Sequence, residues 1–350
     1  MDRVIRVVVV DDSAYVRKVV REILSRSPFI EVVGAARDGR EALDLVEQLN
    51  PDVVTCDLIM PELDGVGFVR EQMQRRPVPI IIMSIANETA EAALTALDSG
   101  AVDFVQKPTA LASEKIFEVS SELIEKVKAA GQISLNKIPA LSIPQSTIKS
   151  EPGAAQITGS HAVDLVVIGI STGGPQALKR LIPQFPQDFP VPIVMVMHMP
   201  VGYTEMYAAK LNEQANVEVR EAAEGDELKP GRAFLAPAGR HMSLKREESG
   251  RVVVHLDSRP FNTLHKPAVD VLFQSAAEVY RNRVLGVVMT GMGSDGKQGA
   301  AWIKAQGGLI FTEAESSCVV YGMPCVVVEA GLSDRSVPLE EMARAIREVV

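Results

Sequence analysis

The 350-residue sequence has only three cysteines, no long hydrophobic run and no excess of positive charge. Cys56, Cys318 and Cys325 are an odd number without metal-ligand spacing, and Cys56 sits in an apolar strand pattern that suits a buried thiol. No apolar run approaches the ~20 residues needed to cross a bilayer. The charged N-terminus also lacks a signal peptide's apolar core. These features fit a reducing cytoplasm and predict a cytoplasmic protein without direct membrane insertion.

Negative charge is concentrated in the first third of the chain. Residues 1–125 hold 13 Lys and Arg against 22 Asp and Glu, whereas residues 126–350 hold 23 of each. Neither part is basic, so no nucleic-acid partner is expected. Most of the acidic excess is read as a solvated surface. The exceptions are Asp11, Asp12 and Asp57, because each ends an apolar strand pattern.

The length and the apolar fraction of 47% suit two domains. In residues 1–125, strands that are apolar throughout alternate with helical patterns, which predicts a parallel sheet covered on both faces. Five such units favour an α/β fold of the flavodoxin-like type, with a five-stranded parallel sheet. The expected strands lie at 5–12, 31–36, 52–57, 79–84 and 104–107, and the helices at 13–24, 40–49, 65–75, 90–98 and from 112.

Residues 126–160 are predicted to be a linker, because the stretch from 130 is rich in Ser, Pro, Gly, Gln and Thr and has no sustained periodicity. A second α/β pattern over 161–350 predicts a doubly wound, mostly parallel domain with an antiparallel hairpin near Glu248–Gly250. Its expected strands lie at 165–171, 192–199, 217–222, 233–238, 242–246, 251–256, 284–290, 309–313 and 325–329, and its helices at 175–182, 204–213, 268–280, 297–306 and 339–349.

Five polar residues end strands of the first domain: Asp11 and Asp12 the first strand, Asp57 the third, Ser84 the fourth and Lys107 the fifth. The carboxyl ends of parallel strands share one edge of the sheet, so these side chains should converge. Clustered carboxylates repel one another unless a hard cation holds them, and Mg²⁺ fits oxygen ligands. Asp57 is then the plausible nucleophile for a phosphoryl group, giving an acyl phosphate.

Together with the turn MPELDG and the Lys107-Pro108 pair, this arrangement resembles the receiver domain of two-component response regulators, over roughly residues 4–122. The resemblance implies Mg²⁺ as cofactor and a histidine kinase as phosphodonor. It places phosphorylation on Asp57, phosphoryl contacts on Ser84 and Lys107, and metal ligation on Asp11, Asp12, Asp57 and the carbonyl of Ile59. Phe104 takes the aromatic switch position, although a plain core phenylalanine is an equal reading.

In the second domain, residues 169–173 read G-I-S-T-G and match the G-x-S-x-G nucleophile pattern between a strand and a helix. A serine nucleophile needs a general base, and His198 directly follows a strand, at the same edge as Ser171. Asp295, in the glycine-rich loop after strand 284–290, can orient the imidazole. The N–H groups around Gly291–Gly293 are candidate oxyanion donors.

Other interpretations of these residues stay open at this point. His241 and His265 lie in loops and are rival bases, whereas His161 and His255 suit structural roles. The chain order Ser, His, Asp differs from that of α/β-hydrolases, so the shared pattern does not predict that fold. A dinucleotide loop would need glycine at the position of Ser171, and that reading is less favoured.

Five separated motifs, GISTGGPQAL, VMHMP, AFLAPAGRHM, HKPAVDVLF and MTGMGSDGKQGA, are similar to the catalytic domain of the chemotaxis protein-glutamate methylesterases, the CheB family. The resemblance covers about residues 160–350. It implies Ser171 as nucleophile, His198 as base, Asp295 as its partner, Thr172 as a supporting residue and the Met292 N–H as an oxyanion donor. Ala268 stands where many relatives have serine.

The family resemblance implies a phosphorylation-regulated enzyme that hydrolyses glutamate γ-methyl esters on the cytoplasmic domains of methylated chemoreceptors. The same machinery could deamidate receptor glutamines. The ester step itself needs no metal or cofactor. We also expect the unphosphorylated receiver to inhibit the esterase. The alternatives are a response regulator with a non-catalytic, partner-binding output domain and a transcription regulator, which the neutral second domain disfavours.

Overall fold

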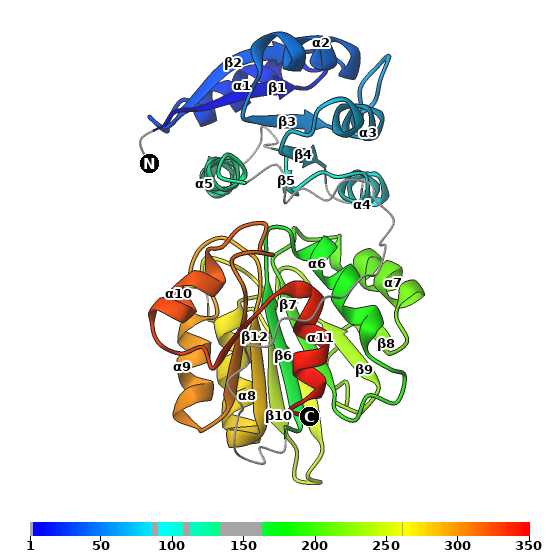
Figure 1. Ribbon diagram of the computed structural model, residues 1–350, viewed down its shortest axis with the longest axis vertical. Coiled ribbons are helices and arrows are strands. Elements are labelled where there is room, and N and C mark those ends of the chain that lie inside the picture. Colours follow the sequence, from blue (N-terminus) through cyan, green and yellow to red (C-terminus); the bar gives the residue numbers. More distant parts are fainter. Residues whose placement is uncertain (1–2, 86–89, 108–112, 134–162, 261) are drawn as a thin grey trace.

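The computed structural model describes residues 3–85, 90–107, 113–133, 163–260 and 262–350, without the side chains of residues 113–119. The chain forms two α/β domains, with the first standing on one end of the second (Figure 1). The fold class expected from the sequence is confirmed for both. Most of the expected linker, and His161, lie outside the described residues.

The first domain is a five-stranded parallel sheet in the order β2-β1-β3-β4-β5. Side chains at three helix starts accept backbone N–H groups: Ser13 from Val16, Asp38 from Glu41, and Asp64. Each such cap stabilises its helix by about 1 kcal/mol. The strands are β1 Ile5–Val10, β2 Ile30–Ala36, β3 Val53–Asp57, β4 Ile80–Ser84 and β5 Asp103–Gln106; the helices are α1 Ala14–Leu24, α2 Gly39–Leu49, α3 Gly65–Arg75, α4 Ala90–Asp98 and α5 Ser113–Ala130.

The second domain contains a seven-stranded parallel sheet in the order β14-β13-β12-β6-β7-β9-β8, with the hairpin β10-β11 as a separate antiparallel sheet. The strands are β6 Leu165–Ile170, β7 Ile193–Met197, β8 Glu218–Glu221, β9 Arg232–Leu235, β10 His241–Arg246, β11 Val252–Asp257, β12 Val284–Val288, β13 Leu309–Glu313 and β14 Arg335–Val337. The helices are α6 Gly174–Leu181, α7 Thr204–Gln214, α8 Val269–Tyr280, α9 Lys297–Ala305, α10 Met323–Glu329 and α11 Leu339–Arg347.

The central strand β6 is buried at every residue, and its alternate side chains enter two different cores. Val166 and Ile168 pack with the face that α6, α7 and α11 cover, whereas Val167 packs with the face of α8, α9 and α10. This two-sided burial explains why the strands read as continuous apolar runs. The chain leaves β6 toward β7 on one side and returns to β12 on the other, so the sheet reverses its winding at β6. Ligand crevices in such sheets form at this reversal, outside the carboxyl ends of the strands.

One predicted element is wrong. Residues 325–329, expected as a strand because of three consecutive valines, are the end of helix α10. Pro324 occupies the first turn of the helix, where its fixed backbone angle is favourable. Met323 and Val327 are buried four residues apart, so tertiary packing overrides the β-propensity of the valines. The last strand of the sheet is instead β14, which was not predicted. Helix α5 also runs to Ala130, past the boundary expected at residue 125.

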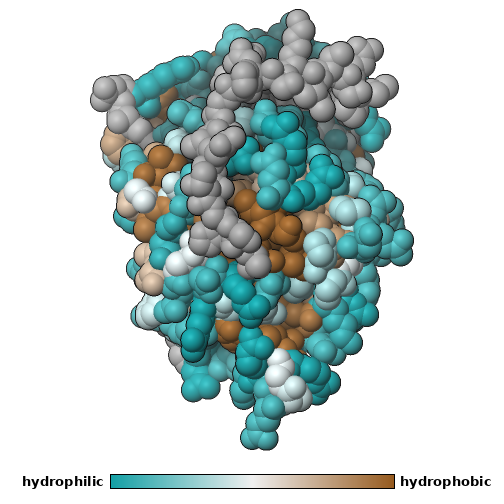
Figure 2. Space-filling model, turned by 60° about the horizontal axis from the view of Figure 1, so that its bottom comes forward, coloured by the Kyte–Doolittle hydropathy of each residue, from teal (hydrophilic) through white to brown (hydrophobic). Residues whose placement is uncertain are grey.

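The end of the molecule farthest from the first domain is largely hydrophilic, with apolar side chains gathered in separate patches (Figure 2). Among the described residues, no helix is long and apolar enough to span a membrane.

Candidate active site

Four charged side chains form an acidic cluster at the carboxyl edge of the first sheet. Ligand atoms of Asp11, Asp12 and Asp57 all lie within 4.8 Å of one another. Lys107 Nζ lies 2.7 Å from Asp57 Oδ2 and 2.9 Å from Asp11 Oδ2. Burial alone would lower the pKa of Lys107, but the hydrogen bonds to the two carboxylates raise it above its ordinary value, so the ammonium stays charged. The three carboxylates present the oxygen donors that Mg²⁺ prefers. Ile59 lies in the following turn and is 61% exposed.

Ser84 and Phe104 contact the second domain through one residue, Tyr203. The Ser84 hydroxyl lies 2.5 Å from the Tyr203 hydroxyl, and the Phe104 ring lies 4.7 Å from the Tyr203 ring. All three side chains are buried. The carboxyl edge of the first sheet is therefore linked directly to the second domain, at a residue five positions after His198.

His198 and Asp295 meet at the carboxyl edge of the second sheet. His198 Nε2 lies 2.8 Å from Asp295 Oδ2. The Asp295 carboxylate also accepts the N–H groups of Val269 and Asp270, at 2.8 and 2.9 Å. Burial alone would raise the pKa of Asp295, but the hydrogen bond and charge of His198 and these N–H donors lower it below its ordinary value. The carboxylate thus stays ionised and holds the imidazole in place.

Ser171 follows β6 directly, so β6 brings it to the edge where β7 brings His198. Its N–H donates to the carbonyl of Thr290, two residues after the end of β12, at 2.9 Å. No hydrogen bond joins the Ser171 hydroxyl to His198 in the described part of the chain, where His198 Nδ1 is buried without a partner. Such contacts are often incomplete before substrate binds. The nitrogen left for a proton is therefore Nδ1, because Asp295 occupies Nε2.

The loop after β12 packs closely against Ser171. A Cβ atom on Gly291 would lie 2.8 Å from the Ser171 Cβ, so only glycine permits this approach. The Gly291 N–H is already bonded to the Val320 carbonyl at 3.0 Å, which removes it from the candidate oxyanion donors. Among the described residues, no acceptor occupies the Met292 N–H, and Met292 stays the candidate donor.

The two rival histidines are engaged in other contacts. His241 is buried and both its nitrogens are engaged: Nδ1 accepts the Ala268 N–H, and Nε2 contacts the Pro260 carbonyl. His265 stacks on His198 with ring centroids 4.0 Å apart. Burial, followed by the neighbouring His198, lowers the pKa of His265 to about 3, so it stays neutral beside His198.

Thr172, next to Ser171, is bound by the first domain rather than by the triad. Its hydroxyl donates to Asp103 Oδ2 at 2.6 Å, and Lys126 Nζ lies 2.9 Å from Asp103 Oδ1. A buried hydrogen bond to a charged group contributes about 1.5–3 kcal/mol. Helix α4 adds contacts to α6, from Gln176 to the Leu97 carbonyl and from Lys179 to Asp98. The first domain thus packs on the edge that carries Ser171.

Sequence reasoning missed Asp103, Tyr203 and Glu313. Glu313 is fully buried at the end of β13 and accepts the Thr290 N–H at 2.9 Å, which fixes the start of the glycine-rich loop. A carboxylate that ends an apolar strand was a usable signal for Glu313. Asp103 and Tyr203 gave no such signal, because their partners lie in the other domain.

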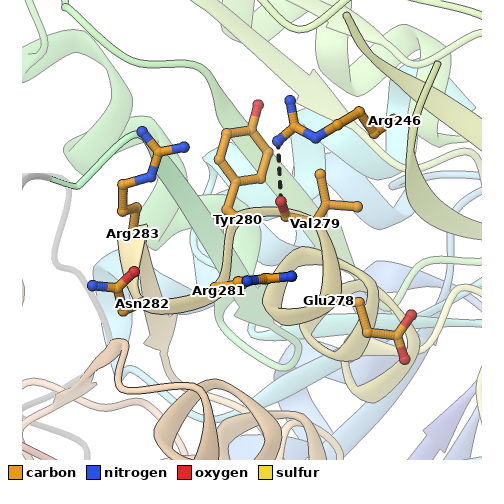
Figure 3. A pocket seen from close by; sticks show the side chains of 7 residues that line it. All are labelled: Arg246, Glu278, Val279, Tyr280, Arg281, Asn282 and Arg283. Carbon is orange, nitrogen blue, oxygen red and sulfur yellow. Dashed lines mark hydrogen bonds between the residues drawn. The ribbon is translucent and has the colours of Figure 1, made fainter. Parts of the chain in front are cut away.

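Two of the pockets on the described part of the surface bear on where the site lies. One, of about 460 Å³, lies at the amino end of β12 (Figure 3) and contains none of the residues discussed above. There Arg246 donates to the Val279 carbonyl, and Arg283 pairs with Asp164. The other, of about 380 Å³, lies between the two domains and includes Met292. Of these two pockets, only the second includes a candidate site residue.

A doubly wound domain with Ser, His and Asp at one edge, packed against a flavodoxin-like domain with an acidic cluster, defines a response regulator with a hydrolase-type output domain. Residues 7–118 match the response regulator receiver domain family, and residues 166–346 match the CheB methylesterase family. The chain therefore belongs to the CheB methylesterase family. The first domain is hereafter the receiver, and the second the catalytic domain.

Similar proteins cover the whole chain. A Myxococcus xanthus protein named protein-glutamate methylesterase/protein-glutamine glutaminase 5 is 49% identical over 99% of this chain and 98% of its own. A Symbiobacterium thermophilum protein named protein-glutamate methylesterase/protein-glutamine glutaminase is 44% identical over 100% of this chain and 98% of its own length. The crystal structure of the Thermotoga maritima CheB methylesterase catalytic domain covers 54% of this chain and 99% of its own, with 41% identity and a TM-score of 0.53.

Proposed function

We propose that this protein is a phosphorylation-regulated serine hydrolase that removes methyl groups from glutamate γ-methyl esters of chemoreceptors and deamidates receptor glutamines. The observation that carries the proposal is the 2.8 Å contact between His198 and Asp295, at the sheet edge that also bears Ser171. Membership of the CheB methylesterase family and the names of the relatives support the substrate. Because the methylated helices of chemoreceptors are cytoplasmic, we place the protein in the cytoplasm.

In the proposed ester step, the Ser171 hydroxyl attacks the γ-carbonyl while His198 Nδ1 takes its proton. Asp295 holds the imidazole and stabilises its charged form. In this step the Met292 N–H donates to the oxyanion of the tetrahedral intermediate. The C–O bond to the methyl oxygen then breaks, and His198 returns the proton so that methanol leaves. Water cleaves the acyl-enzyme by the same route and releases glutamate.

Deamidation follows the same steps. A glutamine γ-amide gives a similar tetrahedral intermediate, and His198 protonates the departing nitrogen, which leaves as ammonia. The acyl-enzyme is then identical to that of the ester reaction, so both substrates end as the same receptor glutamate. Thr172 supports this site through its carbonyl, which accepts the Thr290 hydroxyl at 2.9 Å.

In the receiver, an Asp57 oxygen forms a bond to phosphorus as the phosphodonor nitrogen of a chemotaxis histidine kinase leaves. Asp11, Asp12, Asp57 and the Ile59 carbonyl would hold Mg²⁺, which supplies positive charge against the phosphoryl group. Lys107 supplies a second positive charge from the protein. The Ser84 hydroxyl would turn to a phosphoryl oxygen and release Tyr203.

The direct test of the function is methanol release from the methylated cytoplasmic fragment of a chemoreceptor, with and without a small phosphodonor such as acetyl phosphate. We expect release in both conditions and a faster rate with the phosphodonor. If the protein released no methanol in either condition, the proposed activity would be wrong. Labelling of Ser171 by a serine-reactive phosphonate would separately exclude a non-catalytic output domain.

As the pH is lowered, the loss of esterase activity should follow the binding of a single proton. His265 stays neutral because its pKa is lowered to about 3, and the pKa of Asp295 is below its ordinary value. Neither group changes charge between pH 5 and 8, so neither adds a second proton to the profile in this range. We expect log(kcat/KM) for the receptor ester to fall with a slope of one as the pH is lowered. A slope of two would contradict the neutral state of His265.

Removing the receiver should raise the unphosphorylated rate. The Thr172–Asp103 and Ser84–Tyr203 contacts hold the receiver over the catalytic edge, and a change of ~1.4 kcal/mol in this packing shifts the open-to-closed ratio about tenfold. A fragment beginning near Thr158 is therefore expected to release methanol faster than the unphosphorylated full chain. If the folded fragment is no faster, phosphorylation aligns the triad instead of uncovering it.

A further inference from the structure

The carboxylate of Asp295 lies at the start of helix α8 as well as beside His198. Its two oxygens accept the first two N–H groups of that helix, from Val269 and Asp270, at 2.8 and 2.9 Å. The first N–H groups of any helix have no partner within the helix. Ala268, the residue before α8, has no side-chain oxygen to supply one. The start of α8 therefore takes its acceptors from Asp295, and Asp295 takes its donors from α8.

Asp270 makes the converse contacts with helix α9, which begins two residues after Asp295. Its Oδ1 accepts the Gly296 N–H at 2.9 Å and the Gly299 N–H at 2.7 Å. Gly296, the residue before α9, has no side-chain acceptor either. Asp295, just before α9, thus caps α8, whereas Asp270, at the start of α8, caps α9. The four hydrogen bonds form a closed ring that ties the two helix starts together.

Close packing of α8 and α9 keeps this ring in place. A Cβ atom on Gly299 would lie 2.4 Å from the Phe273 Cβ and 3.1 Å from the Asp270 Cα, so only glycine permits the approach. The start of α9 is therefore fixed against α8. Asp295, which precedes α9 and meets His198, is held from both helices.

The ring places two carboxylates side by side in the interior. Burial is the largest cause that raises the pKa of Asp270 above its ordinary value; the Gly299 N–H opposes it, and the charge of Asp295 adds to it. The two helix starts offset the repulsion, because each presents the positive end of its dipole to a carboxylate. Asp270 is therefore retained beside a like charge at a site where it holds the neighbouring helix.

We propose that Asp270 is a positioning residue of the esterase, which holds the Asp295 carboxylate against His198 by tying the start of α9 to the start of α8. Asp295 Oδ2 is shared between the His198 imidazole and the Val269 N–H. A shift of either helix start would therefore change the contact with His198. The effect on turnover rests on the proposed function, whereas the geometry at His198 can be measured without substrate.

The kinetic test compares Asp270→Ala with Asp270→Asn in the full-length protein. Alanine removes the acceptor of both α9 N–H groups, whereas the asparagine oxygen can still accept them. With methylated receptor fragment, kcat of the alanine variant should fall about 10- to 100-fold and KM should stay within about twofold, since a misplaced catalytic group affects the transition state and not substrate binding. The asparagine variant should keep kcat within about threefold of wild type.

An NMR signal should report the same geometry without substrate. Because the ionised Asp295 carboxylate can only accept, the bonded proton lies on His198 Nε2. In the protein labelled with ¹⁵N-histidine this proton should give a downfield signal, identified by its loss in His198→Ala. The signal should be shifted or lost in Asp270→Ala and retained in Asp270→Asn. If the alanine variant does not fold, Asp270→Glu serves instead: it keeps the charge but displaces the carboxylate by one methylene, so kcat should fall and the signal should shift.

Ser275→Ala is the matched control for a loss of stability. Ser275 is buried on the same helix, and its hydroxyl bonds the backbone of Leu244 and Leu272, at 3.0 and 2.9 Å. The substitution leaves the buried Leu244 N–H without its partner, so it should lower the melting temperature. It should leave kcat and the His198 signal unchanged.

An unchanged kcat in Asp270→Ala would overturn the inference. A fall in kcat with a wild-type His198 signal would also overturn it, since the effect would not pass through Asp295. Equal losses in the alanine and asparagine variants would show that the N–H contacts do not position Asp295. Losses that follow the melting temperature alike in Asp270→Ala and Ser275→Ala would reduce Asp270 to a stabiliser of the fold. Failure of the wild-type protein to release methanol would overturn the proposed function alone, because the NMR comparison uses no receptor.

Discussion

Replacing Ser171 with alanine is expected to reduce methanol release from methylated receptor by about 10⁴-fold or more, with the fold retained. The hydroxyl is the only group of this residue lost, and the structure gives it no partner among the described residues whose loss would unfold the domain. The backbone contact that holds the residue, from its N–H to the Thr290 carbonyl, is unaffected by the substitution.

The measurement compares initial rates of methanol release for wild type and Ser171→Ala, with matched thermal melts. Ser294→Ala is a suitable control, because Ser294 lies in the loop near Asp295 but its side chain is exposed. It should keep most of the activity. His198→Ala and Asp295→Ala should also be severe, because the members of a triad act as a unit. Near-wild-type release by Ser171→Ala would remove Ser171 from the mechanism.

Much of the architecture could be predicted because burial on both faces leaves a clear pattern. Strands β3 and β6 are buried at every residue, and this is what their unbroken apolar sequences indicated. The strand prediction was wrong for residues 325–329, where the valines belong to helix α10, which has Pro324 in its first turn. Local composition favoured a strand there, and only packing against the sheet decided otherwise.

The candidate site residues that directly follow a strand could be predicted from the sequence. Ser171 follows β6 and His198 follows β7, so the topology alone brings them to one edge. The ring nitrogen that faces Asp295 was not predictable, because it depends on the orientation of a side chain. Nor was the bond from Thr172 to Asp103, whose partners lie 69 residues apart and meet only because the domains pack together.

Replacing Asp57 with asparagine should abolish phosphorylation of the receiver. Asparagine is nearly isosteric but a poor nucleophile, so the acyl phosphate cannot form. Its side-chain oxygen can still accept the Leu58 N–H, which Asp57 accepts at 2.7 Å, and Asp11 still pairs with Lys107. The receiver should therefore stay folded and packed on the catalytic domain. We expect the unphosphorylated rate of methanol release to stay near that of wild type, and the increase caused by phosphodonor to disappear.

The measurement is the stoichiometry of labelled phosphate on the protein after incubation with labelled phosphodonor and Mg²⁺. Asp12→Asn is the informative comparison, because Asp12 is an exposed member of the same carboxylate cluster. As a metal ligand and not the acceptor, Asp12 should affect the rate: the Asp12→Asn protein should still incorporate phosphate, more slowly, and should recover as Mg²⁺ is raised. The Asp57→Asn protein should incorporate none at any Mg²⁺ concentration. Stoichiometric label on Asp57→Asn would show that another residue accepts the phosphoryl group.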